Sequence, residues 1–199
     1  MEATATGSAA RVARQRRAMP SGWWGMVLLI ATEFTLFASL IASYFYLRFQ
    51  NTPWPPAGID DPSVTLPLVF TGMLVATCIP MFAAVRSVRA GQRWLAWAFV
   101  ALALVVQATY LGLQIWLFVG DMNSFSPSAT AYGSIYFALL GTHHAHVAVG
   151  LALDAWLLGA LAFGLTNYRM IALRVIALYW YFVAFVAILV VLTQIYPTL

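Results

Sequence analysis

The sequence predicts an all-α protein, an integral membrane bundle of five transmembrane helices with its N-terminus in the cytoplasm and its C-terminus outside. Of its 199 residues, 63% are hydrophobic and 8% are charged, and the mean hydropathy is +0.85. A soluble domain of this length could not bury so much apolar surface, so the lipid bilayer is the solvent that this composition fits. Long apolar stretches and an uneven distribution of arginine complete the prediction.

Five apolar stretches are long enough to cross about 30 Å of hydrocarbon at about 1.5 Å per residue. They cover residues 23–47, 66–88, 94–119, 132–163 and 175–196, inside one predicted transmembrane domain of residues 22–199. The fourth stretch is longer than one span needs and should tilt or protrude. Pro67 suits a helix start, whereas Pro80 lies inside the second span and should kink that helix near Ala76.

The positions of the basic residues, all ten of which are arginine, set the predicted orientation. Nine of them lie before the first span, between the second and third spans, or between the fourth and fifth. Only Arg48 falls on the opposite side, together with Asp60, Asp61 and Asp121. The positive-inside rule therefore places the N-terminus in the cytoplasm and the C-terminus outside.

Residues 1–21 are small, polar and basic, and we expect them to form a disordered cytoplasmic tail that touches anionic headgroups at most. A signal peptide is the alternative, but no small-residue cleavage site ends the apolar run after Gly22. The net charge of +4 does not indicate a nucleic-acid partner, since the arginines follow the membrane topology. Cys78 is the one cysteine, which excludes an internal disulfide and a thiolate metal cluster.

Familiar catalytic patterns are missing from the sequence. It contains no recognisable nucleophile with a base, no phosphate-binding glycine loop and no dinucleotide fingerprint, so we predict no catalytic centre in this chain. It has no visible internal repeat either, which gives no support to the inverted-repeat design of many transporters.

Ionisable residues inside the membrane are costly, so each one is a functional hypothesis. Glu33 lies near the midplane of the first span, and the three histidines of the chain lie at a similar depth in the fourth span. Helical spacing puts His143, His146, Gly150 and Asp154 along one stripe, while His144 points about 100° away from His143. This stripe could face another helix, and Gly150 would let that helix approach closely.

Two chemistries are conceivable for the stripe. Histidines at i and i+3 can share a metal, with Glu33 and Asp154 as further ligands, but tight metal sites need three or four ligands with supporting partners. Bis-histidine haems in bundles usually draw their ligands from two helices, whereas all the histidines here come from one. A bound metal or haem is therefore disfavoured.

The second chemistry is proton handling. A carboxyl group at the midplane is expected to stay protonated unless a cation lies nearby, and Glu33 with His143 or His146 could form a neutral pair, an ion pair or a proton relay. The same pair could instead only lock two helices together, because unsatisfied polar groups in lipid must find partners. Asp154 lies nearer the cytoplasmic side, where we expect water to reach it and local pairing or capping to satisfy it.

Other residues are assigned to packing or to the lipid boundary. The small residues in "ASLIAS" predict a helix-packing face on the first span. We expect Arg48, Trp54 and Trp180 to contact lipid or the membrane interface, where arginine and tryptophan are typical anchors.

Three stretches resemble subunit III of the haem-copper oxidases, in its short five-helix form. They are "ATEFTLFASLIASYFYLR", "YGSIYFALLGTHHAHVAVG" and "ALRVIALYWYFVAFVAILVVLTQIY", and with their order and spacing the resemblance covers nearly all of the chain from Gly22 onward. Glu33 falls on the intramembrane glutamate of that family, and His143 and His146 fall on its two histidines.

The chain also departs from the family pattern. Where the family has YWHFVD, this sequence has Tyr181 in place of the histidine and Ala184 in place of the aspartate, and Arg174 replaces a glutamate shortly before. Thr142 and His144 replace the phenylalanine and the second glycine of the motif GFHG. These differences question a role of the fifth helix in headgroup or proton contacts. They point to a divergent branch, such as a quinol oxidase, an oxidase in a supercomplex or an accessory relative of a nitric-oxide reductase.

The resemblance implies a subunit without redox centres of its own, in the inner membrane of a bacterium. Such a subunit packs against catalytic subunit I and against subunit II, in a complex whose haem and copper lie in the partner subunits. It binds phospholipids in a cleft and supports proton uptake and oxygen access. The longer relatives have two further N-terminal helices, where this chain has only the basic tail.

Two alternatives from other classes stay open. One is a small proton-coupled transporter that uses Glu33, His146 and Asp154, and the other is an electron-transfer subunit that carries haem or a metal.

Overall fold

The computed structural model describes residues 20–196, which form six helical segments and no strand. The segments are α2 (Ser21–Gln50), α3 (Thr65–Ala76), α4 (Cys78–Arg89), α5 (Arg93–Ser124), α6 (Ala131–Ala162) and α7 (Asn167–Ile195). α3 and α4 follow each other as one span, so five spans are long and apolar enough to cross a membrane. The predicted fold class is therefore confirmed. Most of the predicted cytoplasmic tail, residues 1–19, lies outside the described range.

Most of the helices extend beyond the apolar stretches from which they were predicted, whereas α6 matches its stretch to within one residue at each end. α7 begins at Asn167 and not near Val175, because Thr166 caps it by accepting a hydrogen bond from the backbone N–H of Arg169 (3.2 Å). α6 begins in the same way, with the Thr130 hydroxyl accepting from the N–H of Gly133 (3.0 Å). Hydropathy identifies the part of a helix in hydrocarbon, whereas the caps set where the helix begins.

The predicted kink in the second span is confirmed. The helix is interrupted at Thr77, between Ala76 at the end of α3 and Cys78 at the start of α4. Pro80 causes the interruption, because it has no N–H to donate to the carbonyl of Ala76, four residues earlier, and its ring crowds that carbonyl.

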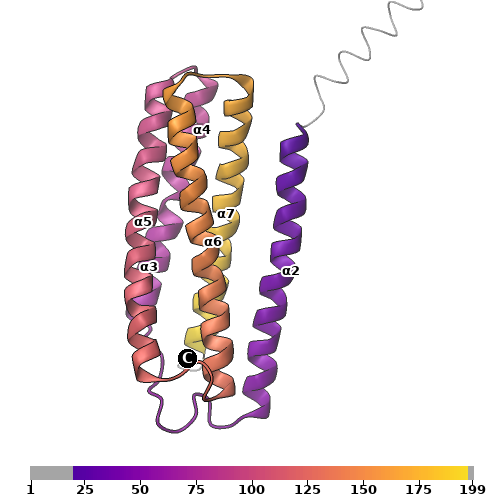
Figure 1. Ribbon diagram of the computed structural model, residues 1–199, viewed down its shortest axis with the longest axis vertical. Coiled ribbons are helices and arrows are strands. Elements are labelled where there is room, and N and C mark those ends of the chain that lie inside the picture. The colour runs from indigo at the N-terminus through magenta and orange to yellow at the C-terminus, as the bar shows by residue number, and fades with distance from the viewer. Residues whose placement is uncertain (1–19, 197–199) are drawn as a thin grey trace, which may run out of the picture.

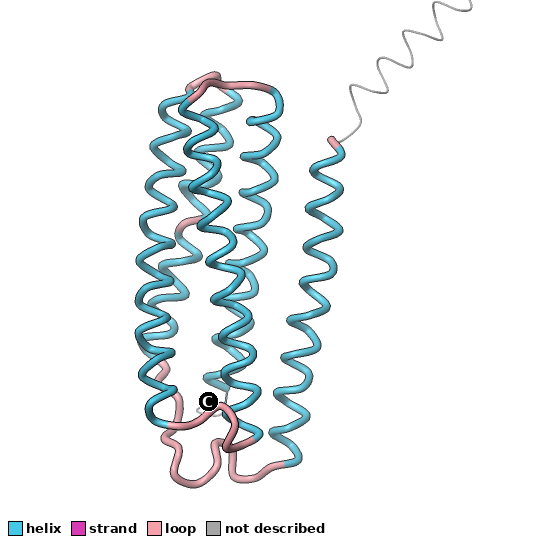
Figure 2. The backbone as a smooth tube through the Cα atoms, viewed as in Figure 1, coloured by secondary structure: helices cyan, strands magenta, loops and turns pink. Residues whose placement is uncertain are grey.

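α7 is the central helix of the bundle, and α2 is the most peripheral one (Figures 1 and 2). Among the described helices, α7 contacts α2, α3, α4 and α6, whereas α2 contacts only α6 and α7. Within their most apolar windows, 61% of the residues of α7 are buried and only 6% of those of α2. The predicted packing face of α2 is exposed in this chain, at Ala38, Ser39, Ala42 and Ser43. This face therefore does not pack against any other helix within residues 20–196.

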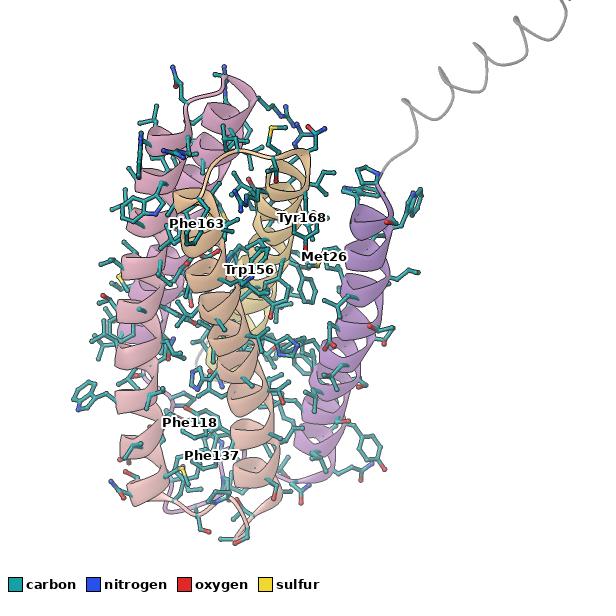
Figure 3. All side chains as sticks on the ribbon, turned by 45° about the horizontal axis from the view of Figure 1, so that its top comes forward. Met26, Phe118, Phe137, Trp156, Phe163 and Tyr168 are labelled. Atoms are coloured by element: carbon teal, nitrogen blue, oxygen red, sulfur yellow. The ribbon has the colours of Figure 1, made fainter. Side chains whose placement is uncertain are left out.

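Aromatic rings fill much of the space between α5 and α6. Phe118 of α5 and Phe137 of α6 meet edge to face with their centroids 5.2 Å apart (Figure 3). Such pairs add about 0.5–1.5 kcal/mol to the burial of the rings.

The two ends of the bundle carry opposite charges. We call the end with the α4–α5 and α6–α7 connections the arginine end, because Arg86, Arg89, Arg93, Arg169 and Arg174 lie there. The opposite end holds the loops 51–64 and 125–130 together with Asp60, Asp61 and Asp121, and we call it the acidic end. That the arginine end faces the cytoplasm stays a prediction from the positive-inside rule.

Candidate functional site: polar pairs inside the bundle

Glu33 of α2 and His146 of α6 are the one carboxyl–base pair within ion-pair distance among the described residues. Glu33 Oε2 lies 2.9 Å from His146 Nε2, and the other ring nitrogen, Nδ1, lies 2.8 Å from the carbonyl oxygen of Thr142. The side chains are 27% and 16% exposed, and the Phe37 ring packs edge to face on the imidazole with centroids 5.0 Å apart. The structure thus selects His146, and not His143, as the partner of Glu33.

The hydrogen bonds of His146 fix the number of protons in this pair. The Thr142 carbonyl oxygen can only accept, so Nδ1 must carry a hydrogen. The contact between Nε2 and Glu33 then needs one further proton, which lies either on the carboxyl group or on the ring. The pair is therefore a neutral pair or an ion pair that shares one proton, and its net charge is zero in both forms.

His143 points to a different helix. Its Nε2 lies 3.0 Å from the hydroxyl oxygen of Tyr110 on α5, and Gln114 Nε2 donates to the same oxygen at 3.4 Å. The imidazole is 1% exposed, and its Nδ1 has no hydrogen-bond partner among the described residues. His144 instead packs edge to face on Phe118. The predicted stripe therefore does not form one site, because each histidine faces a different neighbour.

Asp154 is 0% exposed, so the expectation that water reaches it is wrong for this chain. With the Gln107 amide oriented so that both of its ends are satisfied, Nε2 donates to Asp154 Oδ2 at 2.9 Å, and the amide oxygen lies 3.3 Å from the Thr77 hydroxyl. The Trp180 indole lies near the same carboxyl group but outside good hydrogen-bond geometry. Asp154 is hidden because α5 and α7 cover this face of α6. Depth along the helix could not reveal that.

Gly150 gives the close helix approach that was predicted. A methyl group built on its Cα would lie only 2.6–3.0 Å from three atoms of the Trp180 ring on α7. Trp180 is therefore 1% exposed, and its assignment to the lipid boundary is corrected: the indole lies inside the bundle, where the missing side chain of Gly150 leaves room for it.

The two other predicted boundary residues lie near the acidic end. The Arg48 guanidinium stacks over the Tyr196 ring at 4.5 Å from its centroid. Trp54 is half-buried and donates its indole N–H to the Tyr44 hydroxyl at 3.1 Å. Both side chains thus contact aromatic neighbours within the chain, and their contacts with lipid stay a prediction.

The geometry bears directly on the metal hypothesis. Among residues 20–196, no three His, Cys, Asp or Glu side chains come together in a group that could hold a metal ion. His143 and His146 are engaged by different helices, at Tyr110 and Glu33, and so do not converge on one point.

Three buried partners were missed from the sequence, namely Gln107, Tyr110 and Gln114 on α5. All three are at most 6% exposed. The signal was present, because residues at i, i+3 and i+7 in an apolar helix lie on one face. These amides and this phenol are uncharged at neutral pH, so charge does not distinguish them from their apolar neighbours.

These features define a class of protein. The chain is a multi-pass membrane protein in which Glu33 pairs with His146, and Tyr110 with His143, across helices inside the spans.

Comparison with known sequences identifies the family. The family described as cytochrome c oxidase subunit III matches residues 2–197, so the chain belongs to that family.

Its relatives come from two kinds of oxidase. The chain is 30% identical over 165 residues to cytochrome c oxidase subunit 3 of Bacillus subtilis (strain 168), which covers 81% of this chain and 78% of that relative. It is 31% identical over 174 residues to cytochrome bo(3) ubiquinol oxidase subunit 3 of Pseudomonas aeruginosa, covering 85% and 80%. For the subunit 3 of Coturnix japonica the identity is 29% over 167 residues, covering 80% of this chain but only 63% of that relative.

Proposed function

We propose that this chain is the non-redox accessory subunit III of a bacterial haem-copper terminal oxidase, located in the inner membrane. Its role is to stabilise catalytic subunit I, next to subunit II, during aerobic electron transport. The observation that carries the proposal is the Glu33–His146 contact of 2.9 Å inside a chain that matches the family over residues 2–197. In this assignment the haem and copper lie in the partner subunits.

The peripheral position of α2 supports a partner surface on that helix. Its outer face carries small residues that none of the other described helices covers, including Ala38 and Ala42. Small residues let helix backbones approach closely in a membrane, where association depends on tight packing. We assign this face to a helix of the catalytic subunit.

A groove at the arginine end supports lipid binding. It has a volume of about 790 Å³ and lies between α4, α7 and the start of α2. Arg86, Arg89 and Arg174 line it together with apolar and aromatic side chains such as Phe82 and Leu178. This combination suits an anionic phospholipid, whose phosphate pairs with the guanidinium groups while its acyl chains lie against the apolar wall. Arg174, which replaces a family glutamate, makes the groove more basic.

The shared proton of Glu33 and His146 supports a role in proton uptake. The proton of this pair can move between the carboxyl group and the imidazole without a change of net charge. A charge on a neighbouring subunit can therefore shift the proton at a small cost in free energy. We expect Glu33→Gln to leave the complex assembled but to lose activity faster during sustained turnover. Equal activity of the variant and the parent over many turnovers would leave the pair only a packing role.

The test of the proposed function is purification in mild detergent through the N-terminal tail. Copurifying chains are identified by mass spectrometry, and a reduced-minus-oxidised spectrum is recorded. We expect a large haem-bearing subunit with its haem bands, and the other partners will show whether the donor is a cytochrome or a quinol. Ala38→Phe together with Ala42→Phe should release that partner. The control is Val105→Phe, because Val105 is 64% exposed on α5, and this variant should keep the partner bound.

A colourless protein without such partners would contradict the proposal. Proton flux in liposomes that disappears in Glu33→Gln would then favour a transporter. A haem band in the isolated chain that is lost in His143→Ala would favour an electron-transfer subunit.

A further inference from the structure

A second cavity, of about 370 Å³, opens at the acidic end, and neither Glu33 nor His146 is among its lining residues. It lies between α3, α5, α6 and α7, beneath loop residues 58–63. α2 contributes no residue to its lining. Neither the family assignment nor the proposed partner and lipid surfaces account for this cavity.

The cavity reaches deep into the span and stays polar to its end. Tyr110 and His143 line its inner part, and Gln114 and Gln194 line its walls. Tyr110 lies 14 residues from Ser124 at the end of α5, which is about 21 Å along the helix and thus near the middle of the bilayer. A polar pocket at this depth is expensive unless its groups are hydrogen-bonded.

Two of these groups have no protein partner. His143 Nδ1 and Gln194 Nε2 are buried without a hydrogen bond to any described residue, and their side chains are 1% and 6% exposed. Buried polar atoms are nearly always satisfied by protein or by ordered water. A volume of about 370 Å³ holds roughly a dozen water molecules at about 30 Å³ each, so water is the natural partner.

The mouth of the cavity is acidic. Asp60, Asp61 and Asp121 line it, and Asp121 accepts a hydrogen bond from the Tyr136 hydroxyl at 2.6 Å. Arg48 is the only basic residue at this end of the described chain, and it stacks on Tyr196 outside the lining. A narrow opening with one sign of charge and low-dielectric walls concentrates the opposite ion by about 10–10³-fold.

We propose that this cavity is a hydrated, cation-selective vestibule that gives water and small hydrated cations, including hydronium, access from the acidic end to the Tyr110–His143 pair. It is not a tight metal site, since no three His, Cys, Asp or Glu side chains of residues 20–196 meet to hold a metal ion. Its function is access: it brings a proton donor or acceptor from the aqueous phase to a histidine in the middle of the membrane.

The vestibule is tested by the reactivity of introduced cysteines in the full chain, purified with whatever subunits accompany it and reconstituted into lipid nanodiscs. The background carries Cys78→Ala, which removes the native thiol, and Gln114→Cys places a thiol on the cavity wall. The control is Ile115→Cys, one residue further along α5, whose side chain is 46% exposed on the outside of the helix. The probes are cationic trimethylammonium-ethyl and anionic sulfonato-ethyl methanethiosulfonate, with each rate divided by that of a free thiol.

We expect Gln114→Cys to react and Ile115→Cys to remain unmodified, because only a thiol in contact with water ionises and reacts. After normalisation the cationic reagent should be faster at residue 114 by about tenfold or more, and Asp60→Asn with Asp61→Asn should remove most of this preference.

Two results would overturn the proposal. Gln114→Cys as unreactive as Ile115→Cys would mean a dry cavity, and equal normalised rates for both reagents would mean a hydrated cavity without cation selectivity. If Gln114→Cys fails to assemble, Leu140→Cys on α6, which also lines the cavity, gives the same reading. The outcome does not depend on which partners copurify, so the vestibule and the proposed function can fail separately.

Discussion

Replacement of Gly150 by alanine tests the contact that brings α6 and α7 together. The added methyl group would lie 2.6, 2.9 and 3.0 Å from three ring atoms of Trp180, whereas ordinary carbon contacts begin near 3.4 Å. The indole is 1% exposed and enclosed by its neighbours, so it has no free space into which to retreat. The helices must separate or the ring must leave its preferred rotamer, and overpacking of this kind costs about 1–3 kcal/mol.

Gly159→Ala is the matched control on the same helix, because a methyl group there would meet no atom within 4 Å. Both substitutions gain the same helix propensity of about 1 kcal/mol, so the difference between them isolates the steric term. We expect Gly150→Ala to be less stable than Gly159→Ala by about 1–3 kcal/mol in free energy of unfolding, measured by titration with SDS in mixed micelles.

A double variant makes the assignment specific. Phenylalanine at position 180 removes the part of the indole that faces Gly150, so Gly150→Ala should cost much less in a Trp180→Phe background than in the parent, with a coupling energy of about 0.5–3 kcal/mol. Equal stability of the two glycine variants, or no coupling to Trp180, would refute the close approach of α6 and α7.

Two further predictions concern buried contacts of α6. Gly133→Ala would place a methyl group 2.6 Å from the backbone oxygen of Ser126, which cannot move like a side chain, so we expect a loss of about 1–3 kcal/mol in the same titration; stability equal to that of Gly159→Ala would contradict it. Asp154→Leu should cost about 1–3 kcal/mol, because it removes one of the two acceptors of the buried Gln107 amide and leaves only the Ala103 carbonyl oxygen at 3.2 Å. Asp154→Asn, which can still accept from that amide, should cost less, and the reverse order would show that the 2.9 Å contact is not formed.

Much of the fold could be predicted from the sequence, because it follows from short-range physics. A helix must have a certain length to cross the bilayer, and Pro80 removes one defined hydrogen bond. The spans and the break at Thr77 could therefore be predicted. The start of α7 was not, since the capping hydroxyl of Thr166 lies in a stretch that reads as a connector. Hydropathy does not report caps.

The site was predictable only in part, for a geometrical reason. Spacing along α6 showed which residues share a face, but that face is wide enough to meet several helices. Which neighbour each residue meets depends on how α2, α5 and α7 are arranged around α6. His146 contacts Glu33, as expected. His143 instead contacts Tyr110, and Asp154 contacts Gln107, and these two partners are uncharged and so are not marked by the charge pattern of the sequence.

α2 is the least buried of the five spans, and it has few polar contacts with its neighbours. α2 touches only α6 and α7, and Glu33–His146 is the one side-chain hydrogen bond that joins α2 to another helix within residues 20–196.

We expect Glu33→Ala to cost about 1 kcal/mol in the SDS titration, since interhelical hydrogen bonds in membranes contribute about 0.6–2 kcal/mol. Glu33→Gln should cost less than half of that, because its amide can donate to His146 Nε2 and so replace the shared proton. Thr32→Ala is the control, as this neighbouring hydroxyl bonds only to the Leu29 carbonyl of its own helix. If Glu33→Ala and Thr32→Ala are equally stable, the pair does not hold α2, and only apolar packing and the partner subunit would fix that helix in place.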